Sequence, residues 1–189
     1  MVVMLFGLVV FLGVHILVSL RGVRADLIDW LGAAQYRGFF SLLALSGLGL
    51  TAYGFGLWRA AGSLSIWDPP SVLRHIVVLL MVPACLAAVC VIVPSHLRAR
   101  LKHPGLVTVK IWAFGHLMAN GDAASMVLFG SVLAWAVYAR IAARRRTESL
   151  PSAPVGHGGD VIVVAGGLAL YAVLVFWFHP YVIGMPVIG

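Results

Sequence analysis

Six long runs of apolar residues constrain this chain more than any other feature of its sequence. They lie near residues 2–20, 38–58, 75–94, 105–119, 122–141 and 160–179. About 20 helical residues are needed to cross the roughly 30 Å hydrocarbon core of a membrane. Only 10% of the residues are charged and 62% are hydrophobic, whereas a soluble domain carries about 25% charged residues. The sequence therefore predicts an all-α fold: an integral membrane bundle of about six transmembrane helices, forming one domain over residues 1–189 within the lipid bilayer.

The run near 105–119 is short and carries Lys110, so hydropathy alone leaves open whether it crosses. Basic residues favour a crossing, because short cytoplasmic loops collect Lys and Arg. With six spans, ten of the 13 basic residues fall on one side: Arg21, Arg24, Arg37, Arg98, Arg100, Lys102, Arg140, Arg144, Arg145 and Arg146. Only Arg59 and Arg74 fall on the other side, whereas five spans split the same residues six against six. We therefore predict both termini outside the cytoplasm, and we attribute the net charge of +7 to topology and not to nucleic-acid binding.

Missing motifs exclude several functional classes. The chain has no C-x-x-C-H motif for covalent haem attachment, no phosphate-binding loop, no G-x-S-x-G and no H-E-x-x-H. Cys85 and Cys90 lie within the third run, where a thiol behaves as a small apolar group. The first run lacks a basic start and a small-residue cleavage site, which indicates a retained helix. The Pro- and Gly-rich stretch 147–159 predicts a flexible loop before the last helix.

Two histidines within the runs point to a cofactor. His15 lies near the basic end of the first run, and His116 lies in the fourth run, which enters from the same face. Ionisable groups inside a span are costly to bury, and two histidines on facing helices are a common way to hold a b-type haem without a covalent bond. If the fourth helix begins near Val107, the two depths can agree; a start at Pro104 places His116 about 18 Å deep. The alternative is that each imidazole only donates to a carbonyl of a neighbouring helix.

Residues near these histidines have side chains that suit a haem site. Trp112 is one helical turn before His116 and can cover a porphyrin edge, and Asn120 is one turn after it and can hydrogen-bond a ligand. Arg24 and Arg37 lie at the cytoplasmic boundary, where they can reach haem propionates. We therefore predict metal ligation by His15 and His116.

Other polar residues have simpler interpretations. We expect His96 and His103 to be solvated in the basic loop, and His157 to lie in the flexible loop. His75 and His179, at the outer ends of two spans, are interpreted as interfacial residues. Asp122 follows Asn120-Gly121, so we expect a tight turn in which Gly121 supplies backbone freedom and Asp122 caps the next helix. A proton relay is the alternative role for this carboxylate.

A family resemblance emerges from motifs along nearly the whole chain. The central one is His103-Pro104, then Lys110-x-Trp112-Ala113-x-x-His116-Leu117-x-x-Asn120-Gly121-Asp122, then Ser125 and Leu128-Phe129-Gly130. The start contains His15-x-x-x-Ser19-x-x-Gly22-x-Arg24 and Tyr36-Arg37-Gly38-x-x-Ser41, and the end contains Phe178-His179-Pro180. This pattern resembles the NnrU family of bacterial membrane proteins, which implies location in the inner membrane.

NnrU proteins are similar to the 15-cis-zeta-carotene isomerase (Z-ISO) of plants and cyanobacteria. In that enzyme a haem b is held by histidines of the first helix and of a W-C-x-x-H motif, so the resemblance implies the same roles for His15 and His116. The cysteine of that motif is Ala113 in this chain. A thiolate ligand at this position is therefore absent, which argues against direct transfer of the isomerase chemistry.

The resemblance leads to three functional hypotheses. The family name implies a role in denitrification or nitrogen-oxide metabolism, so the first is a haem b protein that transfers an electron or binds nitric oxide. The second is a haem-dependent isomerase of a hydrophobic polyene such as a carotenoid. The third is a non-enzymatic accessory subunit of a respiratory complex. A haem spectrum and a carotenoid analysis distinguish these hypotheses.

Overall fold

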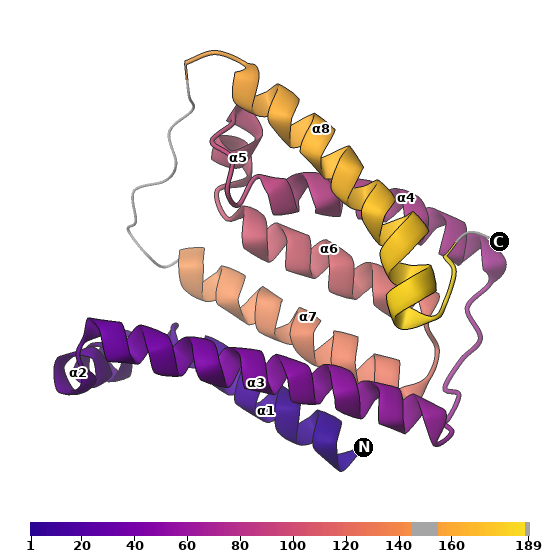
Figure 1. The fold of residues 1–189 in the computed structure, drawn as a ribbon, viewed down its shortest axis with the longest axis horizontal. Helices are drawn as coiled ribbons and strands as arrows, with labels where there is room; N and C mark the ends of the chain where they lie inside the picture. Colours follow the sequence, from indigo (N-terminus) through magenta and orange to yellow (C-terminus); the bar gives the residue numbers. More distant parts are fainter. Residues whose placement is uncertain (145–154, 188–189) are drawn as a thin grey trace. The chain divides into compact units, whose positions relative to one another are not determined.

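The computed structural model describes residues 1–144 and 155–187, and this part of the chain is helical (Figure 1). The helices are α1 (Val2–Leu17), α2 (Arg21–Leu31), α3 (Ala33–Ala60), α4 (Ser71–Val89), α5 (His96–Leu101), α6 (Pro104–Ala119), α7 (Ala123–Arg144), α8 (Gly158–Val173) and the π-helix η1 (Leu174–Ile183). Each of the six predicted runs forms a helix, and the all-α prediction is confirmed. Residues 147–154 of the predicted loop 147–159 lie outside the described residues.

Four helices are long and apolar enough to cross a membrane: α3, α4, α7 and the continuous pair α8–η1. The pair α1 and α2 passes the same test only when taken together, and it is bent by 93° at the short break between them. Helix α6 has 16 residues, which extend over about 24 Å at 1.5 Å per residue. The structure thus supports four or five candidate spans among the described residues, and the sixth span stays a prediction.

The chain forms two compact units that interleave along the sequence. One comprises Met1–Asp68 and Asn120–Arg145, and contains α1, α2, α3 and α7. The other comprises Pro69–Ala119 and Arg146–Gly189, and contains α4, α5, α6, α8 and η1. They are called unit 1 and unit 2 below. Each has its own buried core, so each can be understood from its own helix pairs.

In unit 1, α1 and α3 pack side by side along their length (Figure 1). Glycines make this approach possible. A Cβ at Gly47 would lie 2.7 Å from the backbone nitrogen of Phe11, and one at Gly7 would lie 2.5 Å from that of Thr51. Gly54 is in direct contact with the backbone of Met4, whose side chain is fully buried. Small residues at helix contacts are typical of membrane proteins, where close backbone packing replaces the hydrophobic effect between helices.

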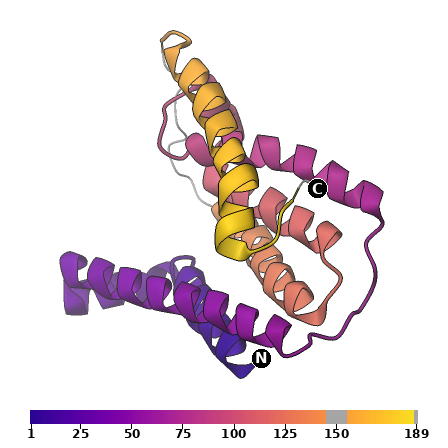
Figure 2. The ribbon, with the colours of Figure 1, turned by 45° about the vertical axis from the view of Figure 1, so that its right-hand side comes forward.

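In unit 2, α4 contacts both α6 and α8, and Figure 2 shows α8 running across this unit. Glycines again mark the contacts. A Cβ at Gly167 of α8 would lie 2.5 Å from the Leu86 side chain of α4, and Gly115 of α6 faces Met81. Cys85 and Cys90 are buried free thiols. This agrees with the prediction that they behave as small apolar groups. Unit 2 is therefore organised around α4.

The turn between α6 and α7 confirms the prediction that Asp122 caps α7. The Asp122 carboxylate accepts hydrogen bonds from the backbone N–H of Ser125 at 3.1 Å and from its hydroxyl at 2.6 Å, so Asp122 caps α7. The expected role of Gly121 as a source of backbone freedom stays a prediction. The carbonyl of Gly121 accepts hydrogen bonds from the N–H groups of Ile66 and Trp67, at 2.8 and 3.2 Å.

The Asp122 carboxyl group stays ionised at neutral pH. Burial acts to raise its pKa, but the hydrogen bonds from Ser125 and the nearby charge of Arg59 outweigh burial and hold the pKa below its usual value. The Arg59 Nε atom lies 3.7 Å from the carboxylate. A carboxylate held in the ionised form is suited to capping and not to exchanging protons near pH 7, so the structure favours the cap over the proton relay.

We expect Asp122→Ala to lower the free energy of unfolding by about 1 kcal/mol, because the N-cap hydrogen bond is lost. Asp122→Asn is the matched control, since asparagine caps helices as well as aspartate does. The pKa of the Asp122 carboxyl group is lower in the folded protein than in the unfolded chain, where it is about 3.9. The stability that the ionised carboxylate contributes is therefore present above the unfolded pKa and is lost as the pH falls through the folded pKa. The stability difference between wild type and Asp122→Asn should therefore shrink on acidification. Thermal unfolding in detergent measures both effects, and equal stability of Asp122→Ala and wild type would contradict the cap.

Single cysteines can test the six-span topology. Arg100→Cys and Arg144→Cys replace exposed residues at the ends of α5 and α7, and Ala61→Cys replaces an exposed residue just after α3. With six spans, a membrane-impermeant maleimide applied to whole cells should label only Ala61→Cys. Arg100→Cys and Arg144→Cys should react only after the cells are broken. Labelling of one of these two in intact cells, with protection of the other, would show that α6 does not cross.

Candidate functional site

His15 lies in an aromatic cluster within unit 1. Its ring is 4.3 Å from that of Phe11, 5.4 Å from that of Phe40 and 5.2 Å from that of Trp135, measured between centroids. The Nδ1–H group donates to the carbonyl of Phe11, one turn earlier in α1, at 2.7 Å. A carbonyl can only accept, so Nδ1 carries the proton and Nε2 has the basic lone pair. Metal-binding histidines are commonly oriented by such a bond from their second nitrogen.

Two buried donors near His15 have no hydrogen-bond partner among the described residues: the Tyr36 hydroxyl and the Trp135 indole N–H. Trp135 touches the His15 ring edge-on, and Tyr36 is linked to the cluster through Phe40, at 6.4 Å between rings. The Arg24 guanidinium lies over the Tyr36 ring, 5.9 Å from its centroid. Buried polar groups are nearly always hydrogen-bonded in folded proteins. This cluster therefore has the donors that an anionic ligand requires.

Sequence reasoning identified Arg24 of this cluster but not Tyr36 or Trp135. Tyr36 is part of the Tyr36-Arg37-Gly38 motif, which was the available signal for it. Trp135 lies in the uncharged fifth run, and nothing in its local sequence distinguishes it from a lipid-facing residue. Arg37 is exposed on α3. The arginine that reaches the aromatic cluster is thus Arg24.

His116 lies in unit 2 and has the same tautomer as His15. Its Nδ1–H group donates to the carbonyl of Trp112 at 2.8 Å, and the two rings are 5.1 Å apart between centroids. The ring of His179 is 6.3 Å from that of His116 and nearly parallel to it, at 23°. His179 donates from Nδ1 to the carbonyl of Leu174, five residues earlier, at 2.7 Å. The interpretation of His179 as a simple interfacial residue is therefore incomplete, because its ring lies beside the predicted ligand.

The structure decides between the two possible starts of α6 and corrects one expectation about its end. The helix begins at Pro104, because proline fits the first helical position, where its missing N–H has no partner to lose. His116 is then about 18 Å along the helix, so the argument from matching depths no longer applies. The helix also ends at Ala119, so Asn120 lies in the turn of unit 1 and not one helical turn beyond His116. Since His15 belongs to unit 1 and His116 to unit 2, their joint ligation of one iron stays a prediction.

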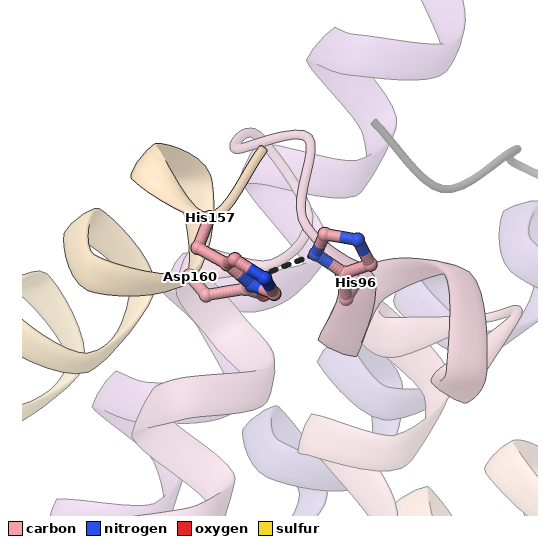
Figure 3. A group of neighbouring side chains, drawn as sticks. All are labelled: His96, His157 and Asp160. Atoms are coloured by element: carbon pink, nitrogen blue, oxygen red, sulfur yellow. Dashed lines mark hydrogen bonds and ion pairs between the residues drawn. The ribbon is translucent and has the colours of Figure 1, made fainter. Parts of the chain in front are cut away.

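A second group of polar side chains lies where α5 meets the start of α8, within unit 2 (Figure 3). His96 is the first residue of α5, His157 is the N-cap residue of α8, and Asp160 lies in the first turn of α8. The Nδ1–H of His96 donates to the Asp160 carboxylate at 2.6 Å, and Nδ1 of His157 lies 3.5 Å from the same oxygen. The two imidazole rings are stacked, 4.8 Å apart.

These contacts correct the expectations for His96 and His157. His96 is only 34% exposed and is bonded to Asp160, so it is not a solvated loop residue. His157 is the N-cap residue of α8, and its Nδ1 atom lies 3.5 Å from the Asp160 carboxylate. The spacing His157-x-x-Asp160 at the start of an apolar run was a usable signal, because positions three apart lie on one helix face. The predicted topology also placed His96 and His157 on the same side of the membrane.

The fold and the histidine-bearing helices define the class of this protein: an α-helical, multi-pass integral membrane protein. The family model described as "NnrU protein" matches residues 3–187. The chain therefore belongs to the NnrU family, as its motifs indicated. No curated protein and no solved structure gave a significant match to the chain.

Proposed function

We propose that this NnrU protein binds a non-covalent b-type haem in the bacterial inner membrane and uses it in redox metabolism linked to nitrogen oxides. The observation that carries the proposal is the cluster around His15. A histidine held in the metal-binding tautomer lies beside the Trp135 ring, and Tyr36 is linked to it through Phe40. The buried donors of Trp135 and Tyr36 have no partner among the described residues. This combination suits a ligand that has both a metal ion and carboxylate groups.

The side chains in both units fit the chemistry of haem. His15 and His116 would provide the imidazole ligands for iron, and each is oriented by a bond from Nδ1 to its own helix. The hydroxyl of Tyr36, the indole N–H of Trp135 and the guanidinium of Arg24 are donors for propionates, and Phe40 supplies an apolar wall. Trp112 covers His116 on α6. When bound, the haem would supply one-electron transfer, while the protein sets its environment. With both imidazoles bound to the iron, nitric oxide could bind only after one of them leaves.

Electron transfer fits this chain better than carotenoid isomerisation. The position of the cysteine in the isomerase motif is Ala113, which is fully buried. A buried methyl group cannot replace a histidine as an iron ligand. Exchange between imidazole and thiolate at this position is therefore excluded, and the residues favour a haem with stable ligation.

An absorption spectrum of purified protein tests the proposal directly. The full chain is purified in detergent, and spectra are recorded oxidised, reduced with dithionite, and reduced after addition of nitric oxide. We expect Soret and α/β bands of a b-type haem, with a pyridine haemochrome showing about one haem per chain. The protein could instead be fully folded but colourless, although haem was supplied during expression. That result would refute haem binding and support the accessory-subunit hypothesis.

We expect Tyr36→Phe to stabilise the haem-free protein and to weaken haem binding. Removing a buried hydroxyl that has no partner relieves a cost of about 1–3 kcal/mol, so the haem-free variant should be more stable than haem-free wild type. If the hydroxyl bonds a propionate, the same change should lower haem affinity about tenfold, which corresponds to a 1.4 kcal/mol hydrogen bond. Thermal unfolding of apoprotein and haem titration measure the two effects. Unchanged haem affinity would contradict the role of Tyr36.

A further inference from the structure

A group of three metal-ligating side chains lies apart from the histidines assigned to haem. His96, His157 and Asp160 each offer one ligand atom, and these atoms all lie within 4.8 Å of one another. They come from two elements that meet in space, the start of α5 and the start of α8. Figure 3 shows the ring of His96 facing the side chains of His157 and Asp160, which overlap in this view. We propose that these three residues form a binding site for a divalent transition-metal ion of the Zn²⁺ type.

The carboxylate is oriented in a way that suits metal binding. The Oδ1 atom of Asp160 accepts from the backbone N–H of Leu97 at 3.3 Å, which fixes the direction of the group. Its Oδ2 atom faces Nδ1 of both histidines, at 2.6 and 3.5 Å. Metal-binding carboxylates are commonly held by a hydrogen bond to their second oxygen. One oxygen of Asp160 is thus anchored to the backbone, and the other converges with two imidazole nitrogens.

Two of the three distances between the ligand atoms are already near those of a zinc site, and the whole set lies within 4.8 Å. Zinc binds nitrogen and oxygen ligands at about 2.0–2.2 Å in a tetrahedron, which places neighbouring ligand atoms about 3.3 Å apart. The contact between His157 and Asp160 already has nearly this length, at 3.5 Å. The contact between His96 and Asp160, at 2.6 Å, has to open by about 0.7 Å to reach this separation. The ion takes the place of the proton shared by His96 and Asp160, and the proton of the neutral ring moves to Nε2.

The donor set selects the class of metal. Two imidazoles and one carboxylate suit zinc and neighbouring transition metals, whereas Ca²⁺ and Mg²⁺ prefer oxygen ligands. The His157 side chain is 85% exposed, and the three residues line an open pocket with Leu97 and Arg100. Three protein ligands leave a fourth position for water or another ligand, as in sites where the metal exchanges or acts. The proposed site is therefore an accessible one.

Equilibrium dialysis against buffered Zn²⁺, with zinc measured by elemental analysis, tests the site. The full chain is used in detergent with a tag that contains no histidine, and iron is measured in the same samples. Wild type should bind one zinc per chain. His157→Gln changes an exposed side chain and Asp160→Asn keeps the size of the carboxylate, so both should fold while zinc affinity falls at least tenfold. His75→Ala removes an exposed histidine of α4 outside this group and should bind zinc like wild type.

The outcomes separate this site from the haem. Haem content and spectrum should be unchanged in His157→Gln and Asp160→Asn, since neither residue belongs to the haem proposal. The proposed metal site would be overturned if His157→Gln and Asp160→Asn bound zinc as tightly as wild type does. It would also be overturned if wild type bound no zinc. In either case the three residues would be a hydrogen-bonded link between α5 and α8. Mg²⁺ at the same concentration should not displace the zinc.

Discussion

His15→Ala and His116→Ala should each yield protein that loses its haem or keeps it with one axial ligand missing. Two neutral imidazoles give a six-coordinate, low-spin iron, and removal of either leaves a five-coordinate, high-spin iron or an empty protein. Ala113 is the buried neighbour of Trp112 on α6, so no thiolate is there to replace a lost histidine. The expected loss of haem occupancy is at least about tenfold, as for removal of an anchoring group of a metal site. Absorption and electron paramagnetic resonance spectra of the purified variants measure occupancy and spin state.

Other histidines of the same chain serve as matched controls for this experiment. His75→Ala, His96→Ala and His157→Ala should keep the wild-type haem spectrum. His179→Ala tests an alternative ligand, because the ring of His179 lies 6.3 Å from that of His116 within unit 2. A low-spin spectrum that survives in His15→Ala and disappears in His179→Ala would overturn the assignment of His15 and identify His179 as the second ligand.

Gly54→Ala should destabilise unit 1 severely, although it adds a single methyl group. The new Cβ would meet the backbone of Met4 and Val3, and backbone atoms cannot turn aside as the end of a side chain can. The helices α1 and α3 then have to separate along the contact that contains His15. Overpacking of this kind costs about 1–3 kcal/mol or more. The yield of monodisperse protein and its thermal midpoint in detergent should both fall.

Two other glycines of α3 provide the control for Gly54. A Cβ at Gly49 or Gly56 would meet nothing within 4 Å. Gly49→Ala and Gly56→Ala should therefore be neutral or should stabilise the helix by up to about 1 kcal/mol, because alanine favours helices more than glycine does. Equal stability of Gly54→Ala and Gly56→Ala would show that the close contact of α1 with α3 does not determine the stability of unit 1.

Hydropathy and capping rules predicted much of this fold, because they depend on neighbours in sequence. The six runs form helices, and Asp122 caps α7 through Ser125 as the local sequence indicated. The bend of 93° between α1 and α2 was not predicted, since the charged stretch after Leu20 has no helix-breaking proline. The start of α6 at Pro104 was predictable from the preference of proline for a first turn.

The candidate sites were harder to predict, because they depend on contacts across the sequence. His15 and His116 were found from their cost of burial and from motifs. The bond between His96 and Asp160 joins residues 64 positions apart, and only the packing of α5 against α8 reveals it. Trp135 also depends on the fold, because only the structure shows that its indole N–H is buried without a hydrogen-bond partner among the described residues. Such residues have no local pattern that a single sequence can show.

The π-helix at the end of the last span fixes the angular position of everything that follows it. Pro180 cannot donate a backbone hydrogen bond, and its ring would clash with the carbonyl four residues earlier in a regular α-helix. The wider turn of η1 avoids this clash and lets His179 bond to Leu174, five residues back. The same wide turn leaves the ring of His179 6.3 Å from that of His116. A proline one position after a histidine thus determines, through the backbone, which neighbour the imidazole has.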